Sequence, residues 1–320
     1  MSSSTWTPAA LSSDVRALAG ICWRIVEAQH HVSTLKLVDS VAEQELLEEL
    51  IEATKPPLPP ECRDLHYLLS TPFRYGAVYP AGSRFRRAGM TAGVFYASEK
   101  PQTAIAEMAF HRLLFFAESP ATPWPSNPAE YTAFSAKYAT RRAIDLTKGR
   151  YAAEKAKWMR VADYSQCQAF ADTARSAKVE VIRYASVRDP GHGMNLALLT
   201  CRAFANSKPI DQQTWHIRLS DAGAQAICEA PKSGITFDRS AFAAMFGLLN
   251  CAGLALPIKR DCRGRRLDAG AMRNRVEGRY QLRQHRTPNQ IIRLIGHIEP
   301  GSGQGEQIRP LGMHRFHAIW

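Results

Sequence analysis

The stretch PQTAIAEMAFHRLLFF, residues 101–116, carries the most information about the fold. Apolar residues occupy nearly every side of a helix drawn through it, and a helix that is apolar all round is buried. Pro101 suits the first turn, where its missing N–H is not needed. The stretch therefore predicts a core helix, on which Thr103, Glu107 and His111 share one stripe because they are spaced four residues apart.

That stripe has two interpretations. It is either the solvent face of the helix or the lining of a pocket. A carboxylate inside a protein needs a partner or water, because an isolated buried charge is very costly. The position of Glu107 in the middle of the apolar helix makes it the first candidate for a functional carboxylate.

Short β-like segments surround this helix and are separated by Gly and Pro. A second helix is expected over 163–176, and the expected strands are Phe73–Tyr79, Gly93–Ala97, Ala143–Leu146, Val179–Val187, Trp215–Leu219 and Ile235–Phe237. No regular βαβ alternation is visible. The pattern favours an α+β domain built around a small, mostly antiparallel sheet.

The N-terminal part looks helical. The spacing of Val15, Leu18, Cys22, Ile25 and Val26 predicts an amphipathic helix over 14–30. A second helix is expected over 41–54, with a capping box of Ser40 and Glu43 and an apolar face of leucines and Ile51. It must end before the prolines at 56–60. We expect residues 1–60 to form a helical extension and residues 61–245 to form the main domain.

The net charge of +12 is concentrated near the C-terminus. Residues 251–320 contain 13 Lys and Arg against five acids, a net charge of +8, which leaves +4 for the first 250 residues. Segments of this composition rarely join a packed core, so residues 246–320 are predicted to be a basic, poorly ordered tail. The tail also allows a basic nucleic-acid-binding protein, although zinc-finger spacing and an evident helix-turn-helix are missing.

Other features narrow the class of protein. The sequence has seven cysteines, with neither a Cys-x-x-Cys pair nor clustered histidines. We therefore expect reduced thiols and no metal site. The longest apolar run, 241–256, is interrupted and shorter than the ~20 residues of a membrane-spanning helix. The N-terminus lacks the pattern of a secretory signal. The sequence therefore predicts a cytoplasmic protein that does not enter membranes.

Arginines precede the core helix, at Arg74 and in the run Gly82-Ser83-Arg84-Phe85-Arg86-Arg87. The planar guanidinium can grip phosphate oxygens in pairs, as a ligand with a pyrophosphate requires. By composition alone, solvated arginines in a surface loop explain the same pattern.

Five short motifs, in this order, resemble the RES family of bacterial toxins, which is named for an arginine, a glutamate and a serine. The three residues correspond to Arg84, Glu107 and Ser186, and the resemblance covers roughly residues 66–240. The motifs are Phe73-Arg74-Tyr75, Gly82-Ser83-Arg84-Phe85, Val94-Phe95-Tyr96-Ala97-Ser98, Thr103-Ala104-Ile105-Ala106-Glu107 and Tyr184-Ala185-Ser186-Val187-Arg188.

The resemblance implies a core similar to ADP-ribosyltransferases and an enzyme that degrades NAD⁺ as its substrate, without a further cofactor. Phosphate or water would accept the ADP-ribose, and a protein acceptor is the alternative. It also implies a cognate Xre-type antitoxin, through which any contact with nucleic acid would be indirect. A homo-oligomer is compatible with the sequence, which does not fix the number of copies. The tail has no counterpart in this resemblance.

The same resemblance assigns roles to residues. Glu107 would stabilise the cationic sugar that forms when nicotinamide leaves, as carboxylates do in glycoside hydrolysis. Arg74 and Arg84 would hold the pyrophosphate, Tyr96 would contact the nicotinamide ribose, and Ser186 would bind near nicotinamide. His111 is expected to orient Glu107, and Arg188 and Asn195 are expected to border the pocket. Each residue could instead have only a structural role; Tyr96 could be a core aromatic residue, and Ser186 could simply end its strand.

Overall fold

The computed structural model describes residues 6–28, 37–74, 82–89, 92–243 and 245. The helices of this part are α1 (Pro8–Asp14), α3 (Val41–Ala53), α4 (Tyr67–Arg74), α5 (Pro101–Glu118), α6 (Gly149–Ala153), α7 (Lys155–Trp158) and α8 (Ser165–Ser176), with 3₁₀ turns η1 (Pro60–Cys62) and η2 (Cys201–Ala203). The strands are β1 (Arg16–Glu27), β2 (Phe95–Ser98), β3 (Ala129–Asp145), β4 (Val181–Ala185), β5 (Met194–Leu198), β6 (Asp211–Ser220), β7 (Gly223–Cys228) and β8 (Ser233–Asp238). The protein is therefore a mixed α+β protein, as the sequence predicts.

The strands form a single mixed sheet in the order β1-β2-β5-β4-β3-β6-β7-β8, in which β1 also pairs with β3. The extra pairing closes the first five strands of this order into a ring. The pair of β3 and β4 is parallel, and the other pairs are antiparallel. The expected antiparallel character is confirmed, but eight strands make a larger sheet than the expected small one.

Strand β3 organises the sheet because it is long enough to serve several neighbours. It pairs with β1 along one side from Tyr131 to Ala143; on the other side its first residues pair with β6 and its last residues pair with β4. Between the β6 and β4 pairings its side chains alternate cleanly: Ala136, Tyr138 and Thr140 are buried, while Lys137, Ala139 and Arg141 are exposed. A strand with one packed face shows this period of two.

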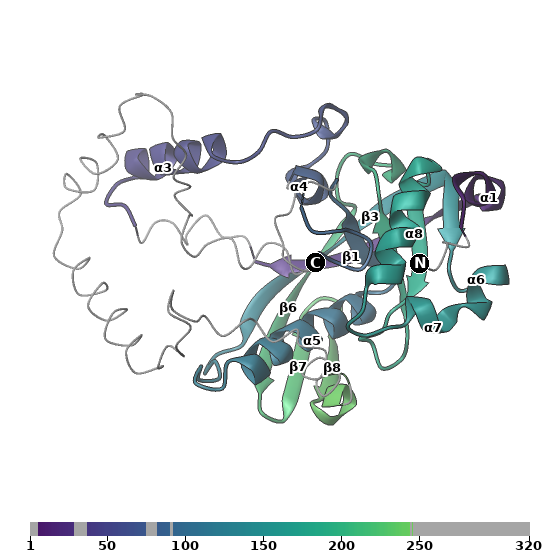
Figure 1. Ribbon diagram of the computed structural model, residues 1–320. Helices are drawn as coiled ribbons and strands as arrows, with labels where there is room; N and C mark the ends of the chain where they lie inside the picture. Colours follow the sequence, from purple (N-terminus) through teal and green to yellow (C-terminus); the bar gives the residue numbers. More distant parts are fainter. Residues whose placement is uncertain (1–5, 29–36, 75–81, 90–91, 244, 246–320) are drawn as a thin grey trace, which may run out of the picture. The chain divides into compact units, whose positions relative to one another are not determined.

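Helix α5 packs on one face of the sheet, where it contacts β1, β2, β6, β7 and β8 (Figure 1). Ile105, Phe110 and Leu113 of α5 are at most 1% exposed and join a core with Trp215 and Phe242. Helices α1 and α7 contact α8, whose Phe170 belongs to a second core. The predicted helices over 101–116 and 163–176 are confirmed.

The predicted helix over 14–30 is wrong, because Arg16–Glu27 is strand β1. Eleven of its residues pair with β3, from Arg16 opposite Ala143 to Glu27 opposite Tyr131. Backbone pairing with a distant strand outweighs a local apolar spacing that fits a helix. The N-terminal region therefore contributes a strand to the sheet and is not purely helical.

Two further local predictions have mixed outcomes. Phe73 and Arg74 of the expected strand Phe73–Tyr79 lie in helix α4, and the rest of that strand lies outside the described residues. Helix α3 is confirmed, with Ser40 Oγ accepting from Glu43 N at 3.2 Å, but Glu43 Oε2 accepts from Asp39 N.

The tail, 246–320, lies outside the described residues, and the domain boundaries stay predictions. Within the described residues, no helix is both long and apolar enough to span a membrane.

Candidate functional site

Glu107 lies in the middle of α5 and is only 2% exposed. Its carboxylate accepts three side-chain hydrogen bonds: Oε1 from Ser186 Oγ at 2.6 Å and Asn195 Nδ2 at 2.7 Å, and Oε2 from Arg188 Nη1 at 3.1 Å. We call these four residues the carboxylate cluster. A buried carboxylate with a cationic partner and two further donors satisfies the requirement that buried charges be paired. The solvent-face interpretation of the stripe is therefore wrong for Thr103 and Glu107, which are each 2% exposed.

Ser186 follows the last residue of β4 and begins a tight turn. Its hydroxyl oxygen accepts from the backbone N–H groups of Arg188 and Asp189, at 3.2 and 2.9 Å, while it donates to Glu107. Its own backbone N–H donates to Gly193 O at 2.8 Å, which closes the turn onto the start of β5. The single hydroxyl therefore fixes both the turn and the carboxylate.

The amide of Asn195 is oriented by strand β2. Asn195 in β5 pairs with Ser98 in β2, and Ser98 Oγ donates to Asn195 Oδ1 at 2.6 Å. The oxygen of the amide is thereby occupied, so its NH₂ group points to Glu107. Ser98 is fully buried, and Asn195 is 1% exposed. Three elements, α5, β2 and β5, thus converge on one carboxylate.

Asp189 fixes the same turn to the start of α5. Its Oδ2 accepts from Thr103 Oγ1 at 2.8 Å and from Gly193 N at 3.1 Å, and its Oδ1 accepts from Gly191 N at 2.9 Å. Gly193 has no room for a side chain, since a Cβ there would lie 2.0 Å from Thr103 Oγ1. The turn can approach the helix this closely only because residue 193 is glycine.

Arg188 joins the cluster to a tyrosine. Its Nη1 bonds Glu107, its Nη2 bonds the hydroxyl of Tyr164, and its guanidinium carbon lies 5.1 Å from the centre of the Phe110 ring. Burial works against the charged form of Arg188, but Tyr164 and Glu107 more than offset this and raise the pKa of the guanidinium. Arg188 is therefore cationic, and its buried Nε has no hydrogen-bond partner within the described residues.

Arg84 is 4% exposed and lies on the other side of the same tyrosine. Its guanidinium carbon is 4.8 Å from the centre of the Tyr164 ring, and its Nη1 donates to Trp158 O at 2.7 Å and Arg160 O at 3.1 Å. Its buried Nη2 has no partner in the part of the chain that the structure describes. Arg84 is thus a buried cation and not a solvated loop arginine.

The remaining predicted site residues make other contacts. Tyr96 is a core residue whose hydroxyl bonds Ser83 Oγ at 2.7 Å and accepts from Phe85 N at 3.0 Å, and burial raises its pKa. Arg74 forms an ion pair with Glu52 at 2.6 Å.

His111 donates no hydrogen bond to Glu107 within the described residues. Burial, followed by the charge of Arg188, lowers the pKa of His111 well below its usual value. The imidazole is therefore neutral near pH 7.

Hollows are present in the described part of the molecule. One, of about 250 Å³, is lined by residues that include Trp158, Tyr184, Ala185, His192 and Met194, and it borders the cluster because His192 Nδ1 lies 2.9 Å from Ser186 O.

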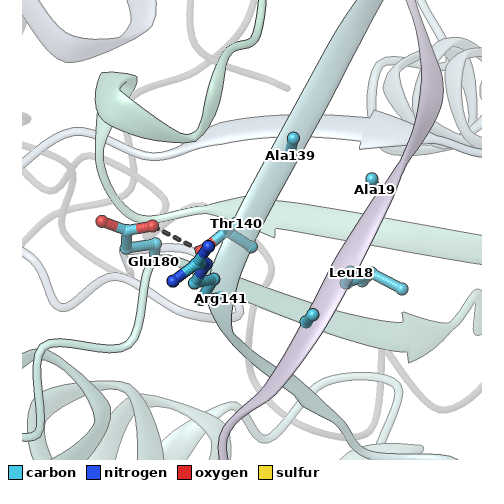
Figure 2. Close-up of a pocket in the computed structure, with 7 residues that line it drawn as sticks. Leu18, Ala19, Ala139, Thr140, Arg141 and Glu180 are labelled. Atoms are coloured by element: carbon cyan, nitrogen blue, oxygen red, sulfur yellow. Dashed lines mark hydrogen bonds between the residues drawn. The ribbon is translucent and has the colours of Figure 1, made fainter.

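Another hollow, of about 470 Å³, lies beside the start of β1 and the last third of β3, and neither hollow is lined by a predicted site residue. Figure 2 shows its lining, where small side chains such as Ala19 and Ala139 adjoin Thr140, which donates to Glu180. The hollow of about 250 Å³ is the better candidate for a substrate site only because His192 in its lining contacts Ser186.

Sequence reasoning missed Tyr164, Asp189, Ser98 and His192. The run Asp189-Pro190-Gly191-His192-Gly193 has the composition of a turn, which could have indicated that the chain reverses between Ser186 and Asn195. The described residues contain no group of three or more His, Cys, Asp or Glu side chains suited to a metal ion.

A family model described as the RES domain matches residues 58–220 of the chain. The match spans just over half of the sequence, and the chain belongs to the RES domain family. No curated protein sequence matches it. Among solved structures, a chain from the crystal structure of the M. tuberculosis MbcT-MbcA toxin-antitoxin complex is 12% identical, with 74% of this chain and 97% of that chain covered and a TM-score of 0.35.

Proposed function

We propose that this RES-domain protein is the toxin of a toxin–antitoxin pair and cleaves the nicotinamide–ribose bond of NAD⁺, with phosphate or water as acceptor. Its core would be of the ADP-ribosyltransferase kind, and an Xre-type antitoxin would neutralise it. Membership of the family supports the proposal, and one structural observation carries it. That observation is the buried carboxylate of Glu107, held by Ser186, Asn195 and Arg188.

The chemistry follows from that arrangement. When nicotinamide leaves, positive charge develops on the ribose carbon, and a fixed carboxylate nearby stabilises it. Ser186 and Asn195 fix the orientation of Oε1, so the carboxylate does not need to reorganise as the charge forms. Preorganised groups of this kind lower activation barriers more than mobile ones.

Two unpartnered donors support an anionic substrate. Nη2 of Arg84 and Nε of Arg188 are buried and lack partners within the described residues. An unsatisfied buried donor on a cation is costly and often indicates an anion that is not present in the structure. The pyrophosphate of NAD⁺ supplies such oxygens. The hollow of about 250 Å³ beside Ser186 would take only one part of the dinucleotide, the nicotinamide side.

The decisive experiment incubates the purified chain with NAD⁺, with and without phosphate, and identifies the products by chromatography and mass spectrometry. Release of nicotinamide with phosphorylated ADP-ribose indicates phosphorolysis, and free ADP-ribose indicates hydrolysis. Label transferred to a protein would instead establish the protein ADP-ribosyltransferase alternative. Intact NAD⁺ under all conditions would refute the proposal.

Substitutions at Glu107 and at a control position test whether the carboxylate cluster carries NAD⁺ cleavage. Glu107→Gln should lower the rate about 10²–10³-fold, the usual loss for one well-placed electrostatic contact. Glu118→Gln, on the exposed end of the same helix, is the matched control and should retain the rate. Equal activity in both variants would show that Glu107 is not the key carboxylate.

A further variant tests the role of Arg84. Arg84→Lys keeps the charge but loses the planar fork, and it should weaken NAD⁺ binding measured by calorimetry in the Glu107→Gln background, where turnover is slow. Unchanged affinity would mean that Arg84 does not bind the substrate and serves only its contacts inside the protein, such as those with the carbonyl groups of Trp158 and Arg160.

A further inference from the structure

Tyr164 lies between two arginines of the site, Arg84 and Arg188. It precedes α8, and its side chain is partly buried. The face of its ring carries the guanidinium of Arg84, 4.8 Å away, and its hydroxyl accepts from Nη2 of Arg188. Arg188 in turn bonds Glu107 through Nη1. Tyr164 is therefore the residue through which two separately placed parts of the site are in contact.

We propose that Tyr164 is a positioning residue that sets both arginines around Glu107, a role that rests on the proposed function for its effect on catalysis. The hydroxyl keeps Arg188 on the carboxylate, and the ring supports Arg84. These two tasks belong to different parts of one side chain, so they can be separated by substitution.

The surroundings explain why Arg188 needs the hydroxyl. Its Nε already lacks a partner among the described residues, and Phe110 lies against its guanidinium. Loss of the bond from Nη2 would leave a second buried N–H unsatisfied, which is costly for a cation. The guanidinium would then shift toward other acceptors or water, and Glu107 would lose its fixed partner.

Arg84 holds the segment that carries Tyr164. Its Nη1 donates to the carbonyl oxygens of Trp158 and Arg160, a few residues before the tyrosine. The ring of Tyr164 is thus supported from the side of Arg84 and uses its other end for Arg188. Cation–π contacts of this kind persist with phenylalanine, because they depend on the ring face.

The test compares Tyr164→Phe, Tyr164→Leu and the wild type in steady-state NAD⁺ cleavage. Tyr164→Phe removes only the hydroxyl and should lower kcat by about tenfold with little change in KM, since tenfold corresponds to one weakened hydrogen bond to a charged group. Tyr164→Leu should lower kcat similarly and also raise KM, because Arg84 loses its support. The control is Tyr67→Phe on α4, where the tyrosine is 55% exposed.

If Tyr164 has only a packing role, the two variants should show different kinetic constants. Tyr164→Phe would then keep kcat within twofold, and Tyr164→Leu would lose activity only in proportion to its loss of folded protein. Either result would overturn the proposal.

A second measurement does not depend on NAD⁺ cleavage. Tyr164 and Glu107 share Arg188 as a partner, so the drop in Tm of the double variant Tyr164→Phe/Glu107→Gln should be smaller than the sum of the single drops. Additive drops would refute the connection through Arg188 even if the wild type is active. If the wild type leaves NAD⁺ intact while the drops are non-additive, the proposed function fails and the positioning of Arg188 by Tyr164 stands.

Discussion

Replacement of Glu107 by glutamine tests the electrostatics of the site apart from its chemistry. The amide oxygen can take the place of Oε1 and keep the bonds from Ser186 and Asn195. The NH₂ group then replaces Oε2 and faces Nη1 of Arg188, so that two donors meet and a buried cation loses its partner. The variant should therefore be less stable than the wild type, although its shape is nearly unchanged.

The magnitude follows from the burial of the pair. The side chains of Arg188 and Glu107 are 13% and 3% exposed. Breaking a buried ion pair by removing one partner costs about 3–5 kcal/mol, and the slight exposure of Arg188 favours the lower end. At about 2–4 °C per kcal/mol for a domain of this size, a loss of about 3 kcal/mol lowers Tm by roughly 6–12 °C.

Thermal unfolding followed by circular dichroism measures this shift. The double variant Glu107→Gln/Arg188→Met removes the orphaned cation and should recover much of the loss, because apolar replacements of a buried pair are often neutral. A Tm for Glu107→Gln within about 1 °C of the wild type would refute the ion pair as described. A double variant less stable than Glu107→Gln would refute the orphaned cation as the cause.

Three other perturbations have defined outcomes. Gly193→Ala forces a Cβ against Thr103 and should cost about 1–3 kcal/mol in urea unfolding, whereas a wild-type midpoint would mean that the turn adapts. The folded-state pKa of His111 is lowered, so the unfolded chain takes up the proton first as the pH decreases. Below pH 6.5 this proton uptake lowers the free energy of unfolding by at most about 1.4 kcal/mol per pH unit, and His111→Gln should remove this part of the pH dependence. An unchanged pH dependence of unfolding would contradict this. Truncation after Met245 should leave NAD⁺ consumption intact, because the RES match ends at residue 220, and a folded but inactive product would show that the tail completes the site.

The sequence was sufficient for elements whose signal is local. Helix α5 is recognisable because its apolar residues are contiguous and a proline begins it, and Glu107 was identified there for that reason. Strand β3 also carries a local signal, since Ala136, Tyr138 and Thr140 alternate with Lys137, Ala139 and Arg141, whereas the expected strand Ala143–Leu146 covers only its end.

Strand β1 had no decisive local signal. Its apolar spacing fits a helix, and its partner β3 begins at Ala129, about a hundred residues later. A window of sequence cannot show a partner that far away. Arg24 in this strand is 6% exposed and donates to Tyr96 O at 2.8 Å, a contact that only the folded sheet creates.

The sequence indicated some of the residues that meet around Glu107 but not their contacts, and Arg74 and Tyr96 make other contacts. Glu107, Ser186, Arg188 and Asn195 were all candidates and do meet, because α5, the end of β4 and the start of β5 converge. Tyr164 carries no motif of its own. Its importance comes from its place between two arginines, which depends on the path of the chain before α8.

The closed ring of strands imposes an order on synthesis. β1 is synthesised well before β3, so it has no complete partner until β3 ends at Asp145, and the last member of the carboxylate cluster, Asn195, follows later still. At about 5–20 residues per second, the nascent chain carries an unpaired N-terminal strand for several seconds or more. The carboxylate cluster cannot assemble before translation has passed residue 195, so the buried carboxylate of Glu107 acquires its full set of partners only after the ring of strands has been made.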